Sequence, residues 1–395
     1  LSLLLFASSK FQLLKKGMLN SPAILVLGIF SFVMFGHNIS AASYLKALLG
    51  HDYFVAHYLP PTQIKIQEQQ KKNLIYIYVE SMESTYRNSD LMGQNLLTIL
   101  DTLKTKYSSV EFDDYTQIKG AHWTIAGMVG SQCGIPLKQI SVTKDSNEQN
   151  QLFGSYLANA KCLTDILKEH GYTNHFIQGT FAGFAGTNEF YLNHSTDKVY
   201  GDVEWPSVYP QFAPLFRNKK THVPGAWTSN DDQLFVYARL QVDELMAKKQ
   251  PFNLMIATYD THPTSGFLSP TCAKKGVKPT EFEKILECTQ EQVVSYIDYL
   301  ATKGYLKNTQ VVIQGDHLTM QNPLYHQLLK AKKRTVYNLL IGDFAGLQKN
   351  NDHVNHFDML PTTLDFIGLK VDGGKAGLGY SAFNAISKKD ADKRN

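Results

Sequence analysis

Five short apolar runs, rich in β-branched and aromatic residues, constrain the fold of this chain more than any other feature. They are NLIYIYVES from residue 73, HFIQG near 176, FNLMIATYD from 252, TQVVIQGD from 309 and TVYNLLIGD from 335. Runs of this kind are typical of strands that are buried on both faces. Helical patterns such as CLTDILKEHGY and CTQEQVVSYIDYLATKGY lie between them. The alternation predicts an α/β domain with a mainly parallel central sheet flanked by helices.

Size and charge narrow the classes of function. The chain has 395 residues, of which 43% are hydrophobic, so it can bury one large core or two medium ones. The 39 basic and 35 acidic residues leave a net charge of +4. Since the sequence holds no dense stripe of lysine and arginine, nucleic acid is a poor candidate as a partner.

The N-terminal region predicts a membrane anchor over residues 1–36. Residues 19–36 run for 18 positions without a charge, which at 1.5 Å per residue barely crosses a bilayer core of about 30 Å. A signal peptide is the alternative, with GHNISAAS as a fair cleavage region. We favour a transmembrane helix because a second apolar stretch precedes it. Lys10, Lys15 and Lys16 then place the N-terminal side in the cytoplasm and the rest of the chain outside.

The remaining chain divides into three predicted parts. Residues 37–72 contain Pro60-Pro61 and the polar run QEQQKK, which are typical of a connector. Residues 73–385 carry all five strand patterns and form the predicted extracytoplasmic domain. Residues 386–395 read as a polar, solvated tail.

Four cysteines, Cys133, Cys162, Cys272 and Cys288, all lie in the predicted extracytoplasmic domain. An even number in a translocated domain suggests two disulfides, for which three connectivities exist. Pairing of neighbours in sequence, Cys133–Cys162 and Cys272–Cys288, is the simplest. No Cys/His spacing supports a zinc site, and four unpaired buried thiols remain an alternative.

Polar side chains follow three of the predicted strands at the point where each strand ends. Glu80 follows the first run, Asp260 and His262 follow the third, and Asp316-His317 follow the fourth. A lone acid in such a place is ordinarily a cap or an ion-pair partner. Ligands of open α/β sheets, however, bind at the carboxyl ends of strands, where these residues would converge. Glu80, Asp316 and His317 would supply oxygen and nitrogen ligands suited to Mn²⁺, Zn²⁺ or, less well, Mg²⁺.

Thr124, in GAHWTIAGMVGSQCGIP, lies where a loop leads into a predicted helix. A threonine hydroxyl is a weak nucleophile, and coordination to a metal is one way to activate it. The helix N-terminus would also offer backbone N–H donors to a bound phosphate. His262 could then protonate a leaving alkoxide or bind a phosphate oxygen.

These motifs together resemble the alkaline phosphatase/sulfatase superfamily, and within it the phosphoglycerol transferases, which include the lipoteichoic acid synthases and the transferases acting on osmoregulated periplasmic glucans. The resemblance covers roughly residues 73–370. It rests on YVESMESTY (78–86), TIAGMVGSQCGIPL (124–137), QGTFAGFAG (178–186), YDTHP (259–263) and QGDHLTM (314–320).

The resemblance implies one divalent metal, typically manganese, held by Glu80, Thr124, Asp316 and His317, with Thr124 as the nucleophile. His262 matches the histidine of the substrate site. The implied donor is phosphatidylglycerol: Thr124 takes the glycerophosphate, diacylglycerol leaves, and the group passes to a glucan or related glycan hydroxyl. The implied location is the bacterial inner membrane, with the catalytic domain facing the periplasm.

This sequence departs from the lipoteichoic acid branch, which binds phosphoglycerol with a neighbouring Trp and Arg. No basic residue occurs from Thr180 to Leu192. Trp227 and Asp231, in AWTSNDD, resemble a family stretch and are candidates to line the pocket; a packed Trp and a helix-capping Asp are the alternative. His122, before the nucleophile, is a further candidate for substrate contact.

Three other functions fit the sequence less well. Sulfatase activity needs a modified Cys or Ser in a C/S-x-P-x-R context, which Trp123-Thr124-Ile125 does not supply. A lipid A or glycan phosphoethanolamine transferase is the nearest rival, but its richer zinc site has no convincing match here. A catalytically silent, membrane-anchored sensor would be expected to lose a ligand or the nucleophile, and all four positions are filled.

Overall fold

The computed structural model describes residues 22–38, 57–60, 63–137, 156–211 and 229–384. These fall into two units that divide between Tyr58 and Leu59. The first contains helix α1 (Pro22–Asn38), within the region where the sequence predicts a helix. Its described side chains, residues 26–34, are all exposed. None of the helices in the described ranges combines the length and the apolar character that crossing a membrane requires.

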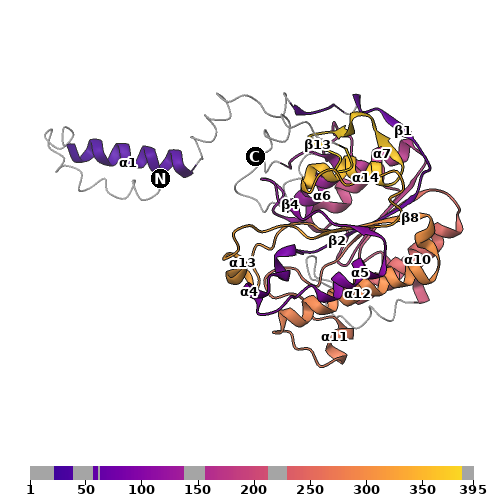
Figure 1. The fold of residues 1–395 in the computed structure, drawn as a ribbon. Helices are drawn as coiled ribbons and strands as arrows, with labels where there is room; N and C mark the ends of the chain where they lie inside the picture. Colours follow the sequence, from indigo (N-terminus) through magenta and orange to yellow (C-terminus); the bar gives the residue numbers. More distant parts are fainter. Residues whose placement is uncertain (1–21, 39–56, 61–62, 138–155, 212–228, 385–395) are drawn as a thin grey trace. The chain divides into compact units, whose positions relative to one another are not determined.

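The second unit is built on one seven-stranded sheet with the order β3-β9-β8-β2-β7-β5-β6 (Figure 1). The strands are β2 (Asn73–Val79), β3 (Ser109–Val110), β5 (Thr173–Gln178), β6 (Lys198–Tyr200), β7 (Phe252–Ala257), β8 (Thr309–Gly315) and β9 (Asn338–Ile341). Every residue of β2, β7 and β8 is buried. All five apolar runs are therefore strands, as predicted.

The sheet is mixed, which corrects the prediction of a mainly parallel sheet in one respect. Strands β8, β2, β7, β5 and β6 run parallel to one another, but β9 runs antiparallel to both β8 and β3. The physical reason is that the connection from β8 to β9 stays at the carboxyl end of β8. No crossover helix carries the chain back to the amino end of β8, so β9 must run in the opposite direction.

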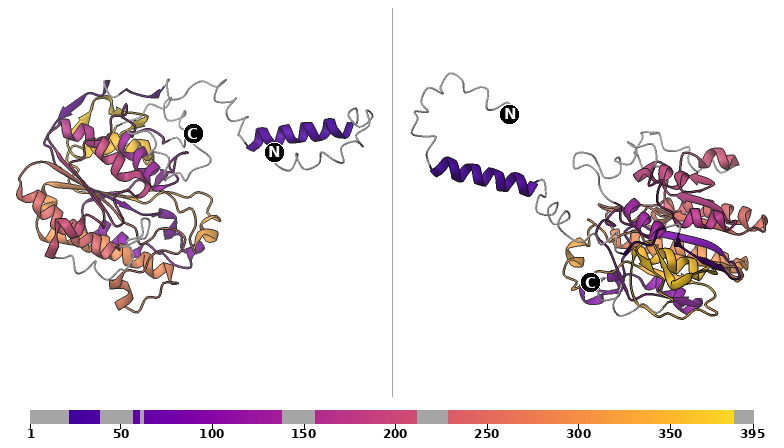
Figure 2. Two further views of the ribbon diagram at one scale, coloured as in Figure 1. Left: turned by 180° about the vertical axis from the view of Figure 1, so that it is seen from behind. Right: turned by 90° about the horizontal axis from the view of Figure 1, so that it is seen from above.

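Helices cover both faces of the sheet (Figures 1 and 2). One layer holds α5 (Thr98–Lys106), α10 (Asp231–Ala247) and α12 (Phe282–Thr302), and the other holds α6 (Thr124–Cys133), α7 (Leu163–Glu169) and α14 (Met359–Phe366). Shorter helices are α4 (Ser89–Met92), α8 (Thr187–Asn193), α9 (Trp205–Val208), α11 (Pro270–Lys274) and α13 (Tyr325–Leu328). This layered architecture puts the buried strands between two apolar helix faces.

Three two-stranded sheets complete the unit. They pair β1 (Ile66–Glu68) with β11 (Leu369–Val371), β4 (Asp114–Thr116) with β10 (His353–Asn355), and β12 (Lys375–Ala376) with β13 (Gly379–Tyr380). Leu59 also bridges to Gly377. Part of the stretch predicted as a connector, from residue 59, therefore belongs to the second unit, whereas the predicted tail lies outside the described residues.

Both predicted disulfides are present. Cys133–Cys162 joins the end of α6 to the start of α7, and Cys272–Cys288 joins α11 to α12. Each closes a short stretch of chain, with sequence separations of 29 and 16 residues. The two bridges therefore fix helices in both layers, and α6 is the helix that begins with Thr124.

Replacing Cys133 and Cys162 together by serine is expected to lower the free energy of unfolding by about 3–4 kcal/mol, because the unfolded chain gains the entropy of an open loop. Urea unfolding followed by far-ultraviolet circular dichroism measures this. A reductant also opens the Cys272–Cys288 bridge, so the reduced parent chain should unfold at a midpoint no higher than that of the double variant. An unchanged midpoint in the double variant would show that the bridge does not stabilise the unit.

Candidate metal centre

Glu80, Asp316 and His317 meet at the carboxyl ends of two adjacent strands. Val79 of β2 pairs with Gly315 of β8, so the residues that follow leave the sheet side by side. All three side chains are about 1% exposed, and their nearest ligand atoms lie within 4.8 Å of one another. The structure thus brings together the three residues that the sequence singled out.

Hydrogen bonds orient the two carboxylates. Ser81, in the left-handed backbone region at φ 51°, donates its N–H to Asp316 Oδ1 at 2.7 Å and its hydroxyl to Glu80 Oε1 at 2.7 Å. The His317 N–H also donates to Asp316 Oδ1, at 2.9 Å. Asp316 Oδ2 accepts no hydrogen bond from the described residues. One oxygen of Asp316 is therefore held in place while the other stays available to a ligand.

His317 is held so that one ring nitrogen faces the carboxylates. Nδ1 lies 2.9 Å from the Leu318 carbonyl oxygen, to which it donates its proton. Nε2 then lies 3.5 Å from Glu80 Oε1 and 3.4 Å from Asp316 Oδ2. A histidine that donates from one nitrogen to a backbone carbonyl presents the other to a metal.

The electrostatics of the cluster fit a cation. Burial, together with the charge of Glu80, raises the pKa of Asp316 to about 7. Burial lowers the pKa of His317, but the carboxylates of Asp316 and Glu80 outweigh it and the net shift is upward. Two buried carboxylates so close together need a positive charge between them, and a divalent ion meets that need. The residues present fit a metal with mixed oxygen and nitrogen ligands.

Thr124 lies beside the cluster as the first residue of α6. Its hydroxyl donates to Glu80 Oε2 at 3.4 Å, and the residue is 8% exposed. The helix reaches this position because Gly127 has no side chain: a Cβ there would lie 2.0 Å from the Asp316 carbonyl oxygen. The start of α6 is therefore fixed against the backbone of a candidate ligand.

His356 and Gly315 are buried and help to fix the position of Asp316, and neither was among the residues predicted from the sequence. His356 donates from Nε2 to the Asp316 carbonyl oxygen at 2.9 Å, and burial lowers its pKa to about 4, so its ring is neutral. A Cβ on Gly315 would lie 1.9 Å from the Met82 carbonyl oxygen. The glycines Gly127 and Gly315 sit inside quoted motifs and could have been noticed there. Nothing in the sequence around His356 marks it as a partner of Asp316.

His262 and His122 both lie near the cluster. The pKa of His262 is lowered by burial, against the effect of its bond to the Pro263 carbonyl, and His317 lowers it further. His262 stacks on Tyr259 at 4.9 Å, and Phe184 meets its ring edge-on at 5.9 Å. The His122 side chain is exposed to solvent on one side. Partial desolvation, and after it the charge of His317, lower its pKa. Both histidines are close enough to His317 for its charge to lower their pKa values.

Asp231 is fully buried at the start of α10, where it forms a reciprocal pair with Asp260. Asp231 Oδ1 accepts the Tyr259 N–H at 2.6 Å, and each aspartate accepts the backbone N–H of the other at 3.2 Å. Burial raises the pKa of Asp231 to about 7. These bonds favour a role in holding the loop that carries His262. Trp227 lies outside the described residues.

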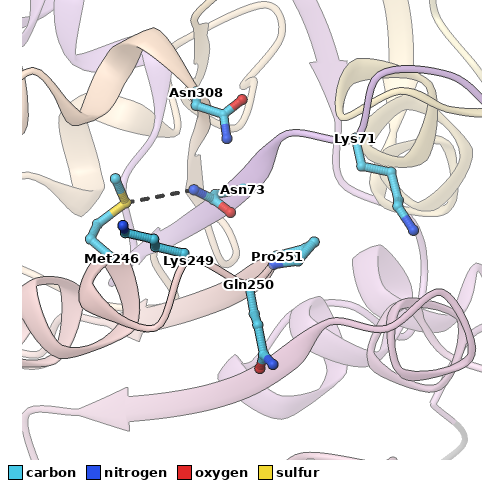
Figure 3. A pocket seen from close by; sticks show the side chains of 7 residues that line it. All are labelled: Lys71, Asn73, Met246, Lys249, Gln250, Pro251 and Asn308. Atoms are coloured by element: carbon cyan, nitrogen blue, oxygen red, sulfur yellow. Dashed lines mark hydrogen bonds between the residues drawn. The ribbon is translucent and has the colours of Figure 1, made fainter.

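A separate hollow of about 360 Å³ lies at the opposite, amino edge of the sheet (Figure 3). Its walls include Asn73, at the start of β2, and Asn308, just before β8. Asn73 Nδ2 lies 3.6 Å from Met246 Sδ, and Lys249 lies beside that sulfur in the view. The metal cluster and this hollow therefore lie at opposite ends of the same strands.

Comparison with known proteins decides the family. The sulfatase family model matches residues 72–369. The chain belongs to the sulfatase family. Phosphoglycerol transferase I from Escherichia coli (strain 55989 / EAEC) and from Shigella boydii serotype 18 are each 33% identical to it over 342 residues. Each alignment covers 86% of this chain and 42% of the relative, so this sulfatase-family chain spans about two fifths of their length.

Solved structures confirm the predicted alkaline phosphatase/sulfatase-like fold. An alkaline phosphatase superfamily protein from Vibrio parahaemolyticus has a TM-score of 0.58 at 19% identity, covering 84% of this chain and 75% of that one. A lipoteichoic acid synthase from Listeria monocytogenes has a TM-score of 0.57 at 18% identity, with 81% and 79% covered. The zinc-bound C-terminal periplasmic domain of EcEptC from Escherichia coli has a TM-score of 0.52 at 14% identity, with 82% and 91% covered.

Adding Mn²⁺ is expected to raise the unfolding temperature of the parent chain, since a ligand that binds only the folded state contributes about 2.7 kcal/mol at 100 times its dissociation constant. Asp316→Asn should remove this gain. It should cost little without metal, because the amide can still accept from Ser81 while a buried charge disappears. Asp372→Asn, at an exposed position, is the matched control. Thermal unfolding with EDTA or Mn²⁺ tests this, and an undiminished gain in Asp316→Asn would contradict the ligand assignment.

Gly127→Ala is expected to weaken both metal binding and any activity at least tenfold, because the new methyl group would overlap the Asp316 carbonyl oxygen and push α6 away. Gly28→Ala, in α1, is the control, since a Cβ there meets nothing within 4 Å. Titration with Mn²⁺ measures the affinity. Parent-like affinity in Gly127→Ala would show that the close approach of α6 is not required.

Proposed function

We propose that this chain is the catalytic part of a metal-dependent phosphoglycerol transferase that takes its group from phosphatidylglycerol and forms a covalent intermediate on Thr124. The observation that carries the proposal is the meeting of the Thr124 hydroxyl with the buried cluster of Glu80, Asp316 and His317. The similarity to phosphoglycerol transferase I and the sulfatase family match support the reaction class.

Glu80, Thr124, Asp316 and His317 would hold one divalent ion, with Mn²⁺ as the first candidate and Mg²⁺ or Zn²⁺ as alternatives. When bound, such an ion lowers the pKa of a coordinated hydroxyl and neutralises charge on a phosphoryl group. The chain's own contribution is position: α6 fixes the Thr124 oxygen, and Ser81, Leu318 and His356 fix the groups around it.

The reaction would proceed in two displacements. In the first, Thr124 Oγ1 gives up its proton and bonds to the phosphorus, the ester bond to diacylglycerol breaks, and the departing alkoxide takes up a proton. In the second, an acceptor hydroxyl bonds to the phosphorus, the threonine ester breaks, and Thr124 regains its proton. His262, beside the cluster, would deliver the proton in the first step or bind a phosphate oxygen.

Different roles are proposed for three further residues, His122, Trp227 and Asp231. His122, exposed and near His317, would contact the head group or the acceptor. The role of Trp227 at the substrate rests on the sequence alone. Asp231 would act indirectly, by holding Tyr259 and Asp260 so that His262 faces the metal. No basic residue occurs from Thr180 to Leu192, and Phe184 of this stretch contacts the His262 ring, so phosphate charge would be met by the metal and His262.

The acceptor would be a glucan or related glycan, and the chain would act at the bacterial inner membrane with its catalytic unit in the periplasm. A membrane position suits a phospholipid donor, and two disulfides suit an oxidising compartment. Sulfatase activity is not proposed, because Thr124 stands where that chemistry needs a modified Cys or Ser.

Thr124→Ala is expected to lower release of diacylglycerol from phosphatidylglycerol at least about a thousandfold, because it removes the attacking oxygen. Thr124→Ser, which keeps a hydroxyl, should retain part of the rate and should trap labelled glycerophosphate on the protein. Fluorescent phosphatidylglycerol, Mn²⁺ and glucan acceptors give the assay. Phosphatidylethanolamine as donor tests the rival head group. Full activity in Thr124→Ala would refute the nucleophile, and label transfer only from phosphatidylethanolamine would refute the donor.

A further inference from the structure

Two exposed apolar side chains of the second unit lie on the segment that begins with the candidate ligands Asp316 and His317. In the part of this unit that the structure describes, the exposed large apolar residues are Leu192, Val203, Met320 and Leu329. Val203 follows β6, and Met320 and Leu329 follow β8, so these three lie on segments that leave the carboxyl edge. Leu192 lies on α8, which leads toward the amino end of β6. Met320 and Leu329 are therefore the exposed apolar side chains nearest in sequence to the candidate ligands.

The β8–β9 connection, residues 316–337, carries two of these side chains. It begins with the candidate ligands Asp316 and His317 and contains α13, which packs beside α4 (Figure 1). Met320 is 46% exposed and Leu329 is 55% exposed. Leu328, next to Leu329, is fully buried, so the connection is anchored to the core from one side and presents the next side chain outward.

The same connection is strongly basic. After Asp316 it holds no acidic residue and has four basic ones in the run KAKKR, residues 330–334. Lys333 pairs with Asp114 and Arg334 with Glu83. Lys330 and Lys332 are exposed, and no carboxylate of the described residues lies within ion-pair distance of either. Neighbouring α4 contributes one acid, Asp90, against these two exposed lysines.

We propose that the β8–β9 connection docks on an anionic lipid surface, with Leu329 and Met320 inserted among the head groups and Lys330 and Lys332 bound to lipid phosphates. Apolar side chains flanked by lysines suit the interface of an acidic bilayer, where each lysine strengthens binding about fivefold. Because the connection starts at Asp316 and His317, docking would bring lipid phosphate close to the cluster. The inference rests on the proposed function for its lipid, but the surface is defined by side chains that the chemistry does not use.

Tryptophan fluorescence in the full chain tests the insertion. Leu329→Trp is compared with Leu192→Trp, which sits at an equally exposed position on α8. Each variant is mixed with vesicles of phosphatidylglycerol and phosphatidylcholine that carry brominated acyl chains, with EDTA present so that no turnover is needed. We expect at least twofold stronger quenching for Leu329→Trp, after subtraction of the parent signal. Equal quenching of the two variants would overturn the proposal.

Charge reversal tests the lipid class. Lys330→Glu with Lys332→Glu is placed in the Leu329→Trp background. The control pair, Lys248→Glu with Lys249→Glu, changes the net charge by the same amount; Lys248 caps the end of α10 and Lys249 lines the hollow of Figure 3. The first pair should lower phosphatidylglycerol-dependent quenching about twentyfold or more, and the second should not. Since α1 is present in every variant, its own contribution cancels.

Three outcomes would overturn docking on an anionic bilayer. They are an equal loss of quenching with both lysine pairs, undiminished quenching by vesicles of pure phosphatidylcholine, or loss of quenching when an acidic glycan that carries no lipid is added to the vesicles. Diacylglycerol release, measured separately with Mn²⁺, keeps the two proposals apart. Release without quenching would leave the transferase standing and remove the docking surface. Quenching without release would support the docking surface and refute the transferase.

Discussion

The site depends on the lateral pairing of β2 with β8. Val79 and Gly315 are partners in a parallel ladder, and an acid follows each of them in the sequence. The two acids therefore leave the sheet side by side. This puts two carboxylates in a buried place where their mutual repulsion is large. The backbone N–H groups of Ser81 and His317 offset part of that cost, and a cation would offset the rest. A fold that merely needed stability would not place both charges there.

The surrounding elements are arranged around that pair rather than around the hydrophobic core alone. On one side, α6 approaches closely enough that Gly127 touches the Asp316 backbone, and the Cys133–Cys162 bridge holds the other end of the same helix. On another side, the Asp231–Asp260 pair fixes the chain that presents His262. The contact of Gly127 and the disulfide carry no charge, whereas the Asp231–Asp260 pair acts through carboxylates that accept backbone N–H groups.

The sequence predicted the features that are encoded locally. Buried strands can be recognised as apolar runs. Because β2 and β8 are parallel, Glu80, Asp316 and His317 must then lie at the same end of the strands, which can be inferred before any contact is known. The direction of β9 was not predictable in this way, because TVYNLLIGD reads the same whichever way the strand runs. His356 was missed for a related reason: it reaches Asp316 from a segment 40 residues away, and only tertiary structure joins them. For Asp231 the sequence left a pocket role and a helix-capping role open, because a buried backbone acceptor and a substrate ligand look alike in sequence.

The antiparallel return of β9 has a consequence for how such a chain can diverge. Both ends of the β8–β9 connection lie at the same edge, so residues can be inserted or deleted between them without changing the order or direction of any strand. A crossover helix would not allow this, since its length must match the sheet it spans. The connection is thus a segment in which relatives can exchange surface chemistry, and engineers can graft new sequences, beside a ligand set that stays fixed.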